Sequence, residues 1–323
     1  MKKRIYILFA AALLLAGCEK EIPLDTEGLE PKVVAMGTVE EGDTLGVRLT
    51  YSRLIYGWHD YYEEYSFEEI ANATVTFAVN GVSMAGAMRD SGDYVTDYIP
   101  QAGDKIDLTV NVPGYEELSA STVVPRKPVL SNLRATQGAT VDYSTTFDVR
   151  FNLNDPAGET NYYVVRLYIY DTTVYGYDIG GTVVYDTFGT GQSELMFSCN
   201  DAAISSFSAM DVDIEGDVDA NLWKLYFIDN NIDGQNHEVH LTGSYYSYMG
   251  DETTTVGSTS HIEVEVEGLS RDRFLYEQSV ELARGDGGEL FEEPTQVHCN
   301  VHNGIGIFAG KAMARAKTKV ETN

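Results

Sequence analysis

The stretch "TVTFAVNGV", residues 74–82, is the clearest indication of how this chain folds. Apolar residues occupy every second position from Val75 to Val79, as in a strand that is buried on one face. Asn80-Gly81 follows, and a second apolar run then begins. Because Asn and Gly both tolerate positive φ, this dipeptide predicts a two-residue type I′ hairpin. The fold is therefore expected to be built from antiparallel strands.

The same alternation recurs on both sides of the hairpin. Leu45–Leu49 and Ile106–Val112 each place apolar residues at every second position, and turn residues separate these runs. The segment "PRKP", residues 125–128, ends the series and is typical of a linker. Residues 31–127 are therefore predicted to form a small β-sandwich.

Residues 128–323 begin a second β-rich domain. Ile262–Val266 alternates with glutamates, which predicts a strand with one face in water. Ser270 is predicted to cap a helix that ends at Gly285, and Asn200 a shorter helix that reaches Ala209. The 22 tyrosines and 30 glycines also favour strands and turns over helices. The whole chain is thus predicted to be mostly β, with one or two short helices.

The first 30 residues have a different character. Residues 1–17 combine a positive start with a short apolar run, as in a secretory signal peptide. They end in Leu15-Ala16-Gly17-Cys18, which resembles the bacterial lipobox, so Cys18 is predicted to be acylated and to become the N-terminus. Residues 18–30 would then be a tether. The alternatives are an ordinary cleaved signal with a chance cysteine, or a short membrane helix.

Composition narrows the possible partners. The chain has 22 basic and 50 acidic residues, a formal charge of −28, and removal of the signal peptide would leave 19 basic residues. Such a charge repels phosphate backbones, which argues against nucleic-acid binding. It also disfavours docking of the body on anionic lipid, so the anchor would depend on Cys18.

Aromatic residues gather in one irregular stretch. "YGWHDYYEEYSFEE", residues 56–69, mixes rings and acids without a clean period, as in a loop. An exposed cluster of aromatic rings suits glycan or peptide ligands, because rings bury a large area at little entropic cost. The alternative is that these rings fold back on the sheet. The predicted ligand contacts are Trp58, Tyr61, Tyr62 and Tyr65.

Two further candidate sites involve metal ligands and cysteines. Asp229, Asn231 and Asp233 precede Gly234 in the spacing of the first half of a calcium loop, but the closing glutamate is missing. Calcium is therefore a possible ligand there, and no other cofactor is predicted. Cys199 and Cys299 would form a disulfide or remain free thiols. No familiar hydrolase or nucleotide-binding motif is present in the sequence, so no catalytic residue is assigned.

Several motifs occur in the order found in one family. They are "CEKEI" at the lipobox, "EPKVVAMGTV", "NATVTFAVNG", "GYEELSASTVVP", "NDPAGETNYYVVRLY", "LYFIDNNIDGQNHEVHL" and "NVHNGIGIFAG". Together they resemble the Bacteroidota outer-membrane lipoproteins known as domain of unknown function 4249. The resemblance implies an N-terminal Ig-like module, similar to carboxypeptidase regulatory domains, and a second β-rich domain. It also implies an outer-membrane setting beside a TonB-dependent transporter, and it supplies no catalytic residue.

The expected function is therefore that of a non-enzymatic, lipid-anchored protein on the outer membrane. The charged residues after Cys18 resemble the export signal of surface lipoproteins, so the protein is expected to face the cell exterior. It would serve as an accessory or ligand-binding subunit beside the transporter. The alternatives are a structural adhesin or envelope-assembly component without a small ligand, and a hydrolase with an unrecognised site.

Overall fold

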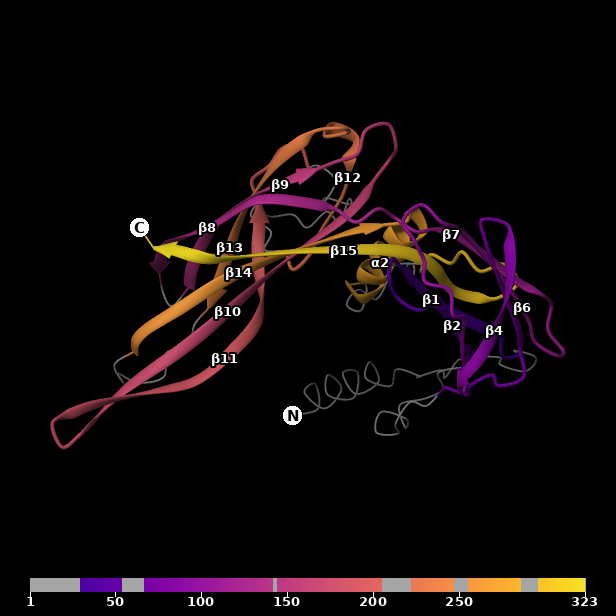
Figure 1. Ribbon diagram of the computed structural model, residues 1–323, viewed down its shortest axis with the longest axis horizontal. Helices are drawn as coiled ribbons and strands as arrows, with labels where there is room; N and C mark the ends of the chain where they lie inside the picture. Colours follow the sequence, from indigo (N-terminus) through magenta and orange to yellow (C-terminus); the bar gives the residue numbers. More distant parts are fainter. Residues whose placement is uncertain are drawn as a thin grey trace, which may run out of the picture. The chain divides into compact units, whose positions relative to one another are not determined.

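Strands make up most of the protein, as the sequence predicts (Figure 1). The structure is a computed structural model that describes residues 30–53, 67–141, 144–204, 222–246, 255–285 and 296–322. The first seven strands are β1 (Val33–Glu40), β2 (Gly46–Tyr51), β3 (Thr74–Val79), β4 (Val82–Asp90), β5 (Asp93–Val95), β6 (Lys105–Asn111) and β7 (Leu118–Val123). The next eight are β8 (Val129–Val141), β9 (Ser144–Asn154), β10 (Tyr162–Ile179), β11 (Thr182–Cys199), β12 (Leu225–Ile228), β13 (Asn236–Tyr246), β14 (Thr255–Leu269) and β15 (Ile305–Thr322).

The predicted hairpin is confirmed. β3 and β4 pair antiparallel down to Val79 and Val82, which leaves a two-residue turn. Asn80 has φ 50° and Gly81 φ 84°, the positive values that a type I′ turn requires. Neighbouring strands extend the hairpin in the order β1-β2-β5-β4-β3-β6-β7. Their inward residues, such as Leu49, Phe77 and Leu108, form one buried core.

The second half closes into a barrel of seven strands. The pairing runs β8-β9-β13-β11-β10-β14-β15 and returns to β8. Each of these strands contributes buried apolar residues to one interior cluster. Phe151 on β9, Leu167 on β10 and Val264 on β14 are examples with no exposed surface. Side chains therefore fill the barrel, as expected for so few strands.

The last strand serves both cores. β15 pairs parallel with β1 over Ile305–Lys311 and then antiparallel with β14 over Lys311–Lys319. Phe308 accordingly packs in the first core and Val320 in the barrel. Residues Lys32–Asn323 form one compact unit. The domain boundary at residue 127 stays a prediction, and β15 pairs with strands on both sides of it.

Helix α2 (Arg271–Gly285) matches the helix predicted after Ser270. Ser270 Oγ accepts a hydrogen bond from the Arg273 backbone N–H at 3.4 Å, as a cap does. The shorter helix predicted from Asn200 lies mostly outside the described residues, which end there at residue 204. A 3₁₀ turn, η3 (Asp229–Asn231), follows β12. Within the described part of the chain, no helix is long and apolar enough to cross a membrane.

The prediction that one face of β14 is exposed to water is wrong. Glu265 and Glu267 are only 3% and 4% exposed, although they alternate with core residues. The reason is that α2 covers the outer face of this strand. Phe274 on the helix packs with Val164 of β10 and Leu269 of β14. The glutamates are thereby buried on the outside of the barrel, where they need cationic partners.

Candidate functional site

The predicted calcium loop folds into a tight turn at the end of β12. The Ile232 N–H donates to the Asp229 carbonyl at 2.6 Å, which closes η3. Gly234 then reverses the chain with φ 69°. This turn places Asp229 and Asp233 on the same side, next to a third carboxylate, that of Asp155.

The three carboxylates form a cluster. One oxygen from each of Asp155, Asp229 and Asp233 lies within 4.8 Å of the others. Asp155 and Asp229 are buried, whereas Asp233 is exposed. Each of the three carboxylates accepts a hydrogen bond. The Tyr163 hydroxyl donates to Asp155 at 2.7 Å, and the backbone N–H groups of Asn161 and Gly158 donate at 2.8 Å to Asp229 and Asp233 respectively.

Burial and neighbouring negative charges disfavour ionisation of Asp229 and Asp155, so both have a raised pKa. Desolvation raises the pKa of Asp229 to about 6, and the charges of Asp155 and Asp233 add to the effect. Burial also raises the pKa of Asp155. Three oxygens of this kind suit a hard cation such as calcium or, without one, shared protons. Calcium binding stays a prediction.

The predicted ligand set differs from the residues that the structure brings together. The Asn231 amide donates to the Ala203 carbonyl at 2.9 Å and does not belong to the cluster. Asp155 takes its place from the end of β9, 74 positions before Asp229. Only the "NDPAG" turn marks Asp155 in the sequence. No local spacing connects Asp155 with Asp229, because the two meet only through the pairing of β9 with β13, which begins directly after the turn.

We expect Asp229→Asn to become more stable than the wild type as the pH rises. The raised pKa means that the folded state holds the proton more tightly than the unfolded chain. The stability from that proton is present below about pH 4 and is lost as the pH passes about 6. Asparagine is neutral throughout, so its advantage should grow by about 2 kcal/mol between pH 4 and pH 8. Urea unfolding at both pH values measures it, and a constant difference would contradict the assigned pKa.

Calcium can be tested on the same pair of proteins. A bound ion would stabilise the wild type by mass action and leave Asp229→Asn unchanged. Equal melting temperatures of the wild type with calcium and with a chelator would exclude the calcium interpretation.

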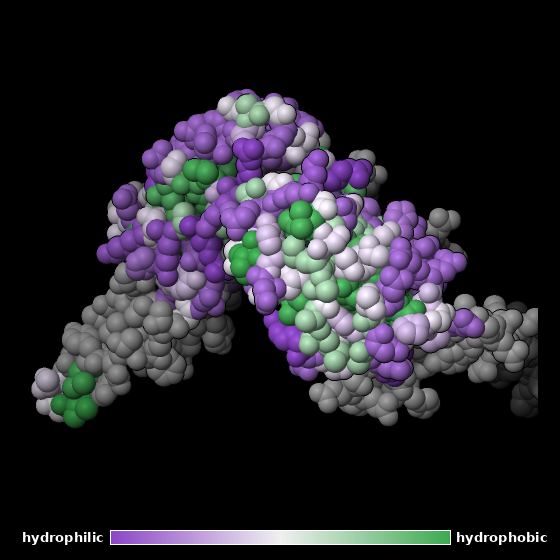
Figure 2. Space-filling model, turned by 45° about the vertical axis from the view of Figure 1, so that its right-hand side comes forward, coloured by the Kyte–Doolittle hydropathy of each residue, from purple (hydrophilic) through white to green (hydrophobic). Residues whose placement is uncertain are grey.

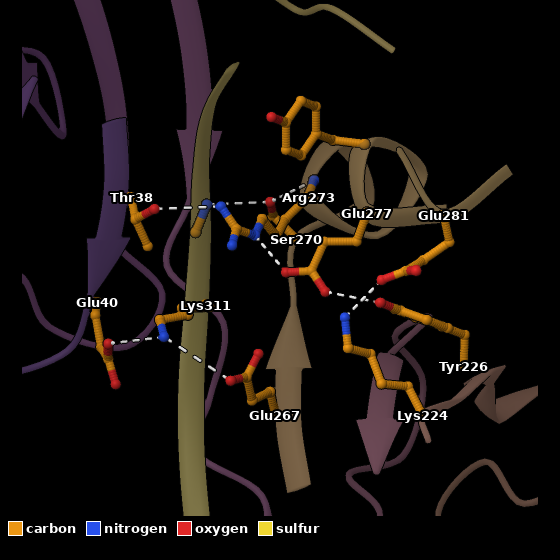
Figure 3. Close-up of polar contacts among 12 residues, drawn as sticks. Thr38, Glu40, Lys224, Tyr226, Glu267, Ser270, Arg273, Glu277, Glu281 and Lys311 are labelled. Carbon is orange, nitrogen blue, oxygen red and sulfur yellow. Dashed lines mark hydrogen bonds and ion pairs between the residues drawn. The ribbon is translucent and has the colours of Figure 1, made fainter. Parts of the chain in front are cut away.

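A second polar cluster lies between α2 and the barrel (Figure 3). Figure 3 shows Glu277 pointing from the helix toward Tyr226 of β12, whose hydroxyl donates to it at 3.1 Å. Arg273 donates to Glu277 at 2.6 Å and to the Thr38 hydroxyl on β1 at 3.2 Å. Lys224 pairs with Glu281 at 2.6 Å. These contacts join the helix to both the barrel and β1.

The buried glutamates of β14 complete this cluster. Arg166 on β10 donates to Glu265 at 3.1 Å and to Glu267 at 3.0 Å. Arg315 on β15 also donates to Glu265, at 2.8 Å. Lys311 bridges Glu267 and Glu40 at 3.8 and 3.5 Å. Because these acids meet cations, the cluster is best explained as a structural network that holds α2, β10, β14 and β15 together.

An open groove of about 220 Å³ lies on the outer face of β1, β2 and β5. Met36, Arg48, Asp93 and Val95 are among the residues that line it. Pockets for small molecules usually enclose roughly 300–1,000 Å³. The groove is therefore smaller than the pockets that usually bind small molecules.

The other predicted site residues divide into two groups. Cys18 and the aromatic residues Trp58, Tyr61, Tyr62 and Tyr65 lie outside the described residues. Cys199 and Cys299 are described, and both are free thiols. The Cys199 thiol is near the Asp201 carbonyl at 3.8 Å, and that of Cys299 near the Val301 carbonyl at 3.6 Å. The structure therefore does not pair them.

The two thiols should differ in reactivity. Burial raises the pKa of Cys199, whereas Cys299 is exposed. Because the thiolate is the reactive form, a thiol reagent should modify native Cys299 at least about tenfold faster than Cys199. Mass spectrometry of the labelled peptides at successive times measures both rates. Equal rates, or no labelling until a reductant is added, would contradict the structure.

Comparison with known proteins places the chain in a family without an assigned activity. No curated protein matches the chain. The family described as "Domain of unknown function (DUF4249)" matches residues 19–316, which is most of the chain. The protein therefore belongs to the DUF4249 family.

Proposed function

We propose that the protein is a non-enzymatic lipoprotein, anchored in the outer membrane through acyl chains on Cys18 and facing the cell exterior. It acts as an accessory or ligand-binding subunit beside a TonB-dependent transporter. The main support for this proposal is a sequence pattern. A short apolar leader ends in Leu15-Ala16-Gly17-Cys18, and charged residues follow directly. Each buried methylene of an acyl chain adds about 0.8 kcal/mol to membrane binding, so several chains give a durable anchor.

Two features of the residues that the structure describes support a binding role rather than a catalytic one. Packed apolar residues fill the barrel, and the buried charges under α2 are paired with one another. Contacts with a transporter or nutrient would therefore be made by outer surfaces and loops. In this proposal, strands β1–β7 correspond to an Ig-like sandwich of the carboxypeptidase-regulatory kind, supported by their short length and common core.

Purification from native membranes tests this function. A C-terminally tagged chain, solubilised in mild detergent, should bring with it a large outer-membrane barrel protein that mass spectrometry identifies. Cys18→Ser provides the control, since it keeps the whole body but lacks the acylated sulfur. Failure to enrich any outer-membrane transporter above this control would contradict the accessory role.

A further inference from the structure

The carboxylate cluster of Asp155, Asp229 and Asp233 lies at one end of the barrel, between two turns. Residues 155–161 connect β9 with β10, and residues 229–235 connect β12 with β13. Figure 1 shows the two turns, in pink and orange, next to each other at the top of the barrel. In Figure 2, hydrophilic residues, in purple, cover much of this end. Because Asp233 is exposed, an ion from solution can reach the cluster.

The alternation of side chains along the strands directs the two buried acids toward the interior of the barrel. Successive residues of a strand point to opposite faces. Asp155 comes two residues after Leu153, which belongs to the barrel core. Asp229 comes two residues after Phe227, which belongs to the same core. The Tyr163 hydroxyl reaches Asp155 from that core at 2.7 Å. The carboxylates therefore close one end of an apolar interior.

The buried acids of this cluster have no basic partner. Asp155 and Asp229 are only 3% and 2% exposed. Among the residues that the structure describes, no ion pair joins either of them, or Asp233, to Lys, Arg or His. Between residues 54 and 295, the stretches outside the described residues contain no Lys or Arg.

The buried glutamates of β14 show how the same protein treats other buried charge. Glu265 and Glu267 each pair with Arg166. Buried carboxylates are costly unless a cation pairs with them or they coordinate a metal ion. Since the chain brings no cationic side chain to the carboxylate cluster, a cation from solution would complete it.

The side chain of Asn161 gives an independent indication of a ligand at this place. Its Oδ1 is buried and accepts no hydrogen bond from any described residue, which is rare for a buried polar atom. Asn161 lies directly opposite Asp229, whose N–H donates to the Asn161 carbonyl at 3.1 Å. Directly opposite residues share a face of the sheet. Asn161 also comes two residues before Tyr163, so its side chain points to the same interior end.

We propose that the carboxylate cluster, together with Oδ1 of Asn161, binds one calcium ion. Calcium takes six to eight oxygen ligands at about 2.3–2.6 Å, so ligand oxygens on opposite sides of the ion are up to about 5 Å apart. One oxygen from each of the three carboxylates lies within 4.8 Å of the others, which fits this range. Water completes the coordination. Magnesium fits less well, because it keeps several waters and is usually held by only one or two carboxylates.

The ion has a structural role in this proposal. It fixes the turn before β10 to the turn before β13, and it neutralises the buried acids between them. All of its ligands belong to the body of the protein, so the inference does not rest on the lipid anchor or on a transporter.

Two asparagines test the ligand set by calorimetric titration of the purified mature chain in detergent, after a chelator has removed bound ions. We expect one calcium site with a Kd of about 10⁻³ M or tighter, and magnesium should bind at least about tenfold more weakly. Asn161→Ala should weaken calcium binding at least about tenfold. Asn231→Ala is the matched control. Asn231 has the sequence spacing of a calcium ligand, but its amide donates to the Ala203 carbonyl, so this variant should bind as the wild type does.

A conservative variant separates coordination from packing. Asn161→Asp keeps an oxygen at the same position and adds a negative charge, so it should bind calcium at least as tightly as the wild type. Equal weakening by Asn161→Ala and Asn231→Ala would overturn the role of Asn161. A titration without a saturable site, or a site that Asp229→Asn leaves unchanged, would overturn the calcium site itself.

Hydrogen exchange locates the bound ion. The backbone N–H groups of Gly158 and Gly234 donate to Asp233 and Asp155. Calcium at a concentration near the wild-type Kd should therefore slow the exchange of both amides in the wild type and in Asn231→Ala, but not in Asn161→Ala. Unchanged exchange at both glycines in the wild type with saturating calcium would place the ion elsewhere and overturn the proposal.

Discussion

Replacing Arg166 with methionine is expected to lower the free energy of unfolding by about 3–5 kcal/mol. Arg166 is itself mostly buried and donates to both Glu265 and Glu267. Those carboxylates have side chains that are 4% and 6% exposed, so the substitution takes from Glu265 one of its two arginine partners and from Glu267 its nearer cationic partner. Urea unfolding at neutral pH measures the loss.

Two further variants separate charge from packing. Arg126 pairs with Glu159 at 3.5 Å, but both side chains are largely exposed, so Arg126→Met should cost less than about 1 kcal/mol. Adding Glu267→Gln to Arg166→Met should recover part of the stability, because it removes one uncompensated charge. If Arg166→Met cost no more than Arg126→Met, the buried glutamates of β14 would not depend on Arg166 for their stability.

Gly306→Ala should cost about 3 kcal/mol through strain and overpacking. Gly306 has φ 122°, a conformation that residues with a Cβ rarely adopt. The added Cβ would also overlap the carbonyl oxygen of Ala35 on β1, where β15 pairs in parallel. The substitution thus strains the contact by which the last strand joins the first core.

The matched control is Gly191→Ala on β11. Gly191 has no positive φ and no neighbour within 4 Å of an added Cβ, so this change should shift the stability by less than about 0.5 kcal/mol. Melting curves of the two variants compare them directly. A Gly306→Ala protein as stable as Gly191→Ala would show that β15 does not lie against β1 as described.

Local features were predictable from the sequence because neighbouring residues determine them. The Asn80-Gly81 turn follows from the φ preferences of two residues, and the start of α2 follows from Ser270 before an amphipathic stretch. The mostly β character follows from alternation. Each of these signals lies within about fifteen residues, where side-chain periodicity is informative.

The unpredicted features all depend on contacts between distant segments. Glu265 and Glu267 have the spacing of a solvent-exposed face. Their burial is explained by the packing of α2 over β14 and by the ion pairs with Arg166. Asp155 joins Asp229 because β9 and β12 end near each other. Likewise, the closure of the barrel requires β15 to pair with β8, which no single segment reveals. Sequence periodicity shows which face is apolar, but it does not identify what covers the polar face.

The proposed function depends on acylation of Cys18, which mass analysis of the native protein can test. The mature chain, extracted from its own membranes, should begin at Cys18, carry fatty-acyl mass on that residue, and partition into the detergent phase of a phase-separating detergent. Cys18→Ser should lack this mass and stay in the aqueous phase. A native protein that begins at another residue, or that enters the aqueous phase without its leader, would contradict both the membrane anchor and the function inferred from it.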